Sequence, residues 1–73
     1  MTLAELSPGE TGTITQLNGK DTLSNRFREL GLLDGVMVRM IKQAPFNGPV
    51  EIKVRNSYLS IRRVDAQKII LEL

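Results

Sequence analysis

The fold is decided by one stretch of the sequence, VEIKVRNSYLSIRR, residues 50–63. Apolar and polar residues alternate on both sides of Asn56-Ser57, which indicates two half-buried strands, 50–55 and 58–63, joined by a two-residue turn with Asn56 at positive φ. The expected pairs are Val54 opposite Leu59 and Ile52 opposite Ile61 on the inner face, and Arg55 opposite Tyr58 and Glu51 opposite Arg62 on the outer face. A slip by one residue would reverse both faces, so the alternation specifies this register.

Three more strands are indicated by short runs rich in β-branched and apolar residues. They span residues 11–17, 36–43 and 69–73. Met40 and Ile41 are adjacent apolar residues within the second run, so either a bulge lies there or both faces of that strand are covered. In the last run, Ile69, Leu71 and Leu73 alternate and are expected to point inward.

A short helix is predicted between the first two of these strands. Apolar residues recur there at i, i+4 and i+7, the spacing of one helical face: Leu23, Phe27 and Leu30. Asp21 or Thr22 can cap its start, and Gly31 is expected at positive φ at its end. Residues 64–68 are expected to form one more helical turn. The sequence therefore predicts a small all-β domain covering residues 1–73, an SH3-like five-stranded barrel with one short helix inserted after the first strand, which removes its edges by closing on itself.

Composition narrows the classes of function. The 73 residues contain neither Cys nor His, and the net charge is only +2, from ten basic and eight acidic residues. No signal peptide and no apolar run long enough to cross a bilayer is present, so we expect a soluble, cytoplasmic protein without membrane insertion. A nucleic-acid binder that relies on phosphate contacts would show a clustered basic stripe, whereas here the nearest feature is Arg62-Arg63, with Arg39, Lys53 and Arg55 scattered before it. No nucleic-acid partner is expected.

Metal and catalytic sites are disfavoured by the residue types. Without Cys or His, the usual ligands of zinc and copper are missing, and no two carboxylates have the i, i+4 spacing of a helical pair. The serines have no candidate base other than lysine, and no glycine-rich phosphate loop opens a helix. We therefore predict no enzymatic activity, no metal site and no cofactor.

Apolar residues in loops point instead to a protein partner. Phe46 lies in the loop of residues 44–49 between two prolines, where it is either a lid over one end of the barrel or an exposed aromatic anchor. Arg26 is either a solvated residue within reach of Glu29 or part of the rim of an interface. The candidate partner-binding residues are Arg26, Leu32, Leu33, Pro45, Phe46 and Tyr58.

Several of these segments, taken in order, resemble the FeoA family, small accessory proteins of bacterial ferrous iron uptake. The resemblance is carried by Arg26-Phe27, the run LGLLDGV of residues 30–36, Ala44-Pro45 with Pro49 and Glu51, and LSIRR of residues 59–63 with Ala66. It implies an SH3-like barrel with an inserted helix, and contact with FeoB, a membrane ferrous iron transporter with a cytosolic GTP-binding domain. The domain type also occurs at the C-terminus of DtxR-class repressors. Because this chain begins with Met and has no helix-turn-helix, we expect the standalone form.

Three hypotheses from different classes follow. The first is an accessory protein that docks on the FeoB-like transporter through its cytosolic G domain, and this is the one we favour. The second is an SH3-like barrel that binds nucleic acid, which requires the basic residues to cluster in three dimensions. The third is a regulatory module of the repressor type, which binds a peptide or the proline-rich segment of a larger protein.

Overall fold

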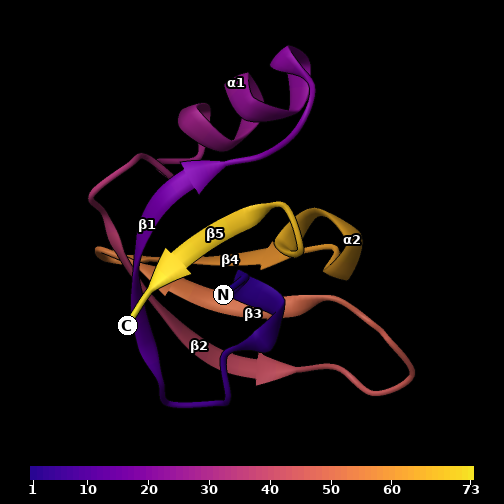
Figure 1. Ribbon diagram of the computed structural model, residues 1–73. Helices are drawn as coiled ribbons and strands as arrows, with labels where there is room; N and C mark the ends of the chain where they lie inside the picture. Colours follow the sequence, from indigo (N-terminus) through magenta and orange to yellow (C-terminus); the bar gives the residue numbers. More distant parts are fainter.

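The computed structural model describes residues 1–73, which form one antiparallel sheet of five strands flanked by short helical segments (Figure 1). The elements are η1 (Leu3–Glu5), β1 (Thr11–Leu17), α1 (Asp21–Glu29), β2 (Met37–Gln43), β3 (Val50–Val54), β4 (Ser57–Ile61), α2 (Arg63–Ala66) and β5 (Ile69–Glu72). Neighbouring strands follow the order β4-β3-β2-β1-β5. The sheet is therefore a meander from β1 to β4, with β5 added beside β1.

The hairpin of β3 and β4 forms, but its predicted register is wrong by two residues. Val54 pairs with Ser57, Ile52 with Leu59 and Val50 with Ile61. The turn is Arg55-Asn56, and the residue at positive φ is Arg55 (φ 55°), not Asn56. A shift of two residues leaves every side chain on its predicted face, so the alternation cannot distinguish the two registers. The observed one places buried Val50 against Ile61, whereas the predicted one sets Val50 against Arg63.

Two bulges bend the sheet. In β2 the register with β3 shifts between Met40 and Lys42, which confirms the bulge considered at Met40-Ile41. In β1 the register with β5 shifts between Ile14 and Gln16. An extra residue on one strand bends that strand and increases its twist, so the five strands curve around a common interior.

The sheet does not close by pairing its two outer strands, contrary to the sequence expectation. β4 and β5 stand at opposite ends of the strand order. The outer edge of β5 is covered instead by the N-terminal segment: the Leu71 N–H donates to the Met1 carbonyl at 2.7 Å, and Thr2 forms a bridge with Ile70. This contact satisfies backbone groups that a free edge would expose.

α1 follows β1 and precedes β2 in the chain, and it lies at one end of the sheet (Figure 1). Its N-cap is Lys20, so Asp21 and Thr22, the predicted capping residues, lie within its first turn. Asp21 is still favourably placed there, because a carboxylate interacts well with the positive end of a helix. The helix is followed by Gly31 at φ 89°, as predicted.

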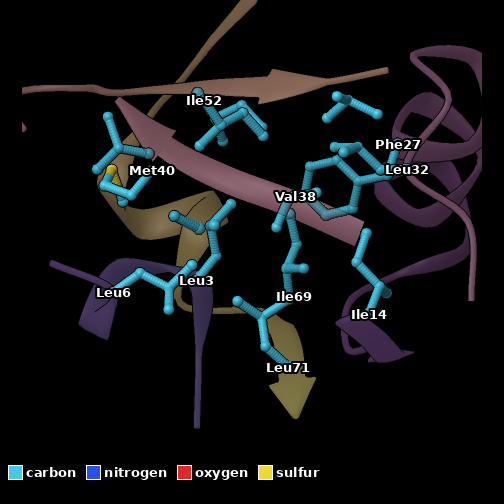
Figure 2. Packing of buried hydrophobic residues seen from close by; sticks show 14 residues of the cluster. Leu3, Leu6, Ile14, Phe27, Leu32, Val38, Met40, Ile52, Ile69 and Leu71 are labelled. Atoms are coloured by element: carbon cyan, nitrogen blue, oxygen red, sulfur yellow. The ribbon is translucent and has the colours of Figure 1, made fainter. Parts of the chain in front are cut away.

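The core contains residues from every element and connects the N-terminal segment to the sheet (Figure 2). Its fourteen buried residues are Leu3, Leu6, Ile14, Phe27, Leu32, Val38, Met40, Val50, Ile52, Val54, Ile61, Ala66, Ile69 and Leu71. Leu3 and Leu6 were not assigned by the sequence, since η1 is too short to show a periodic pattern. Leu73, which was expected to point inward, follows the end of β5 and is 75% exposed.

Candidate partner-binding surfaces

Phe46 is an exposed aromatic residue on the loop that joins β2 to β3. The residue is 99% exposed, which excludes the alternative of a lid over the barrel. The loop is held closed by hydrogen bonds from Ala44 N–H to the Pro49 carbonyl (3.0 Å) and from Gly48 N–H to the Pro45 carbonyl (3.1 Å). Phe46 itself has φ 58°, a conformation that is uncommon for a bulky residue. Pro45, beside it, is exposed as well.

Leu32 is not part of any surface, and its assignment as a partner-binding residue is wrong. It is completely buried and lies beside Phe27 in the core (Figure 2). The reason is the turn at Gly31, which directs the next residue inward beneath α1. Leu33 is 39% exposed, yet it precedes the start of β2 whereas Phe46 follows its end. A strand of seven residues separates them by roughly 20 Å, so the two residues do not form one patch.

Arg26 is exposed on α1 and borders a small hollow of about 100 Å³ between this helix and the end of β4. The hollow is also lined by Arg62 and Asp65, which form an ion pair with 3.0 Å between Arg62 Nε and Asp65 Oδ2. Arg26 forms no ion pair with Glu29. The two salt bridges of the chain join Arg62 to Asp65 and Lys42 to Glu51. Its guanidinium is therefore available at the surface.

Tyr58 is 60% exposed on the outer face of β4. The shifted register places Lys53 opposite it in place of Arg55, and the Lys53 ammonium lies 5.5 Å from the centre of the tyrosine ring. The register continues this row across the sheet, since Lys53 pairs with Arg39 and Arg39 with Thr11. One row of outward-facing residues therefore crosses four strands.

An open depression of about 530 Å³ lies along this row. Its lining residues are Thr11, Gly35, Val36, Met37, Val38, Arg39, Lys53 and Arg55. Three of them are cations that appeared scattered in the sequence, and none of the three has an anionic partner. The sequence analysis missed that Arg39 and Lys53 occupy outward-facing positions of adjacent strands, with Arg55 in the turn that follows β3. Only the strand order shows that the three converge.

The structure shows no group of three or more carboxylates close enough to share a metal ion. It also contains no helix with the length and apolar character needed to cross a membrane. Two surface features stand out: the exposed aromatic loop that carries Phe46 at one end of β2, and the cationic depression at the other end.

A family model described as the FeoA domain matches residues 1–73. The chain belongs to the FeoA family. Its sequence is 33% identical over all 73 residues to a Porphyromonas gingivalis protein named Fe(2+) transport protein A/Fe(2+) transporter FeoB fusion protein, and the match spans only 9% of that much longer relative. The resemblance noted in the sequence is thereby confirmed.

Solved structures of FeoA proteins have the same fold. The solution structure of FeoA from Chlorobium tepidum superposes with a TM-score of 0.92 at 27% identity, covering 100% of this chain and 70% of that one. The crystal structure of Stenotrophomonas maltophilia FeoA complexed with zinc, described as a prokaryotic SH3 domain protein, has a TM-score of 0.86 at 26% identity, covering 99% and 89%. This FeoA domain is therefore a small SH3-like β domain.

Proposed function

We propose that this FeoA-family chain is a cytoplasmic accessory protein of ferrous iron uptake that binds a FeoB-type transporter at its cytosolic GTP-binding domain. The observation that carries the proposal is the fusion relative, in which a segment similar to the whole of this chain belongs to the same polypeptide as a transporter. Fusion of two modules raises their effective concentration to about the millimolar range, which is useful when their own contact is weak. A separate chain would make the same contact between two molecules.

The size of the domain is consistent with a modest contact. Its accessible surface is 4617 Å², so a partner face of about 800 Å² would cover roughly a sixth of it. Interfaces of that size range widely in affinity, and a surface with few anchors belongs to the weaker part of the range. We expect a dissociation constant of about micromolar.

Phe46 is the residue we expect to anchor this contact. An aromatic side chain that is almost fully exposed contributes nothing to the core, and its backbone is held at φ 58° by a closed loop. A preorganised aromatic residue loses little freedom on binding and can bury a large apolar area. These properties favour a role in recognition over a role in folding.

The test is calorimetric titration of the transporter's cytosolic domain with the parent chain and with Phe46→Ala. The parent should bind at about micromolar concentration, and Phe46→Ala should abolish measurable binding while its thermal melt stays unchanged, because no packing is lost. Leu73→Ala is the matched control, since it also truncates an exposed apolar residue. If the parent does not bind, the proposed function is wrong. If Phe46→Ala binds like the parent, the contact lies elsewhere on the domain.

A further inference from the structure

The cationic depression is built at an energetic cost that the fold does not require. Arg39 and Lys53 are direct partners in the β2–β3 ladder, and like charges placed opposite each other destabilise a sheet. Arg55, beside them, occupies the turn position at φ 55°, where glycine or asparagine would be less strained. No carboxylate of the chain compensates any of the three. Two unfavourable features in one depression indicate a site retained for a ligand, since such strain concentrates where a protein functions.

We propose that this depression, formed by Arg39, Lys53, Arg55 and the apolar residues Val36 and Met37, binds an acidic segment of the protein partner. The inference deepens the proposed function, on which it rests, by naming the chemistry that the transporter must present. Carboxylates of the segment would pair with the three cations and relieve their mutual repulsion. An apolar side chain of the segment would contact Met37, which is an exposed and adaptable residue.

An acidic protein segment fits this depression better than a nucleic acid does. The chain has a net charge of +2, of which these three cations supply +3, so the remaining surface carries −1. A polyanion that continues beyond the depression would therefore leave the favourable region, whereas a short peptide would stay within it. Tyr58, the one aromatic residue beside the site, already has Lys53 over its ring, so that face is not free to stack on a base.

The deciding variant is Arg39→Glu, because binding and stability should change in opposite directions. It places a carboxylate opposite Lys53, so we expect the melting temperature to rise by about 2–5 °C. The same change should weaken binding of the transporter's cytosolic domain at least about tenfold at low salt, with a smaller effect at high salt. Arg28→Glu, on the exposed side of α1, is the matched control for net charge and should change binding by less than about twofold.

Two further probes separate failure of this site from failure of the proposed function. The isotopically labelled parent chain is titrated with a synthetic peptide of glutamates flanked by leucines and, separately, with a short single-stranded DNA, while backbone amide shifts are followed. The peptide should shift the amides of Arg39, Lys53 and Arg55 at lower concentration than the DNA. If the parent does not bind the transporter but the peptide still shifts these amides, the proposed function is wrong and the acidic-segment site is supported.

The inference is overturned by either of two results. One is that Arg39→Glu and Arg28→Glu affect transporter binding equally, which would mean that only overall charge matters. The other is that the DNA titrates these amides more tightly than the peptide, which would assign the depression to nucleic acid.

Discussion

Gly31 decides where α1 ends and where the next residue goes. With φ at 89°, it allows the Leu32 N–H to reach the Phe27 carbonyl (2.9 Å) and its own N–H to reach the Arg28 carbonyl (3.0 Å). This pair of bonds is the Schellman motif, which satisfies carbonyls at a helix end and brings the residue after the glycine against the helix. It is the reason that Leu32 is buried while Leu33 is exposed.

We expect Gly31→Val to destabilise the domain by more than about 1 kcal/mol, because a β-branched residue is strained at this φ. A Cβ at position 31 would meet no atom within 4 Å, so the loss would come from the backbone and not from a clash of the Cβ. Thermal melts measure it, with Gly31→Asn as the control that tolerates left-handed backbone and should lose less. Equal melting temperatures for Gly31→Val and the parent would show that the turn imposes no such constraint.

At the scale of elements, one carboxylate supports the start of η1. The Glu5 carboxylate accepts a hydrogen bond from the Thr2 N–H at 2.7 Å, at the start of the 3₁₀ turn that carries Leu3 into the core. This backbone hydrogen bond, with a smaller contribution from the Thr2 side chain, lowers the pKa of Glu5 below its ordinary value of 4.5. The bond is strongest to the charged form, so protonation weakens the start of η1.

The stability that Glu5 contributes should therefore depend on pH. Because its folded pKa is lowered, the contribution is complete above pH 4.5 and disappears as the pH falls through the folded pKa. Glu5→Gln should melt below the parent at neutral pH, and the two melting curves should converge in acid. Glu29→Gln, on the exposed surface of α1, is the control for the loss of one negative charge. A gap between Glu5→Gln and the parent that stays constant down to acid pH would refute the linkage.

At the scale of the whole molecule, Gln43 connects three segments that are distant in sequence. Its side-chain amide donates to the carbonyls of Ala4 (3.2 Å) and Leu6 (2.7 Å), and its oxygen accepts from Arg63 Nη1 at 3.2 Å. These bonds hold the N-terminal segment and α2 to the end of β2. The same N-terminal segment carries the core residues Leu3 and Leu6. By holding this segment in place, the partly buried network supports the packing of the core.

Replacing this network should have a global effect. Gln43→Leu removes a donor from two carbonyls and an acceptor from a partly buried guanidinium, and we expect it to lower the free energy of unfolding by about 1–3 kcal/mol. Urea denaturation measures the change. Gln16→Leu removes an exposed side-chain hydrogen bond to Asn18 and should change the stability by no more than about 0.5 kcal/mol. Similar losses for the two variants would mean that the connection made by Gln43 is not special.

The sequence by itself determined which side of β3, β4 and β5 faces the core, where the inserted helix ends, and that chemistry based on Cys or His is absent. These are local properties: alternation, a glycine at positive φ and residue type each act over a few positions. Only the tertiary structure decided the register of the β3–β4 hairpin, because two registers that differ by two residues have the same inner face. It also decided the burial of Leu3 and the convergence of Arg39, Lys53 and Arg55, since each depends on which distant segments become neighbours.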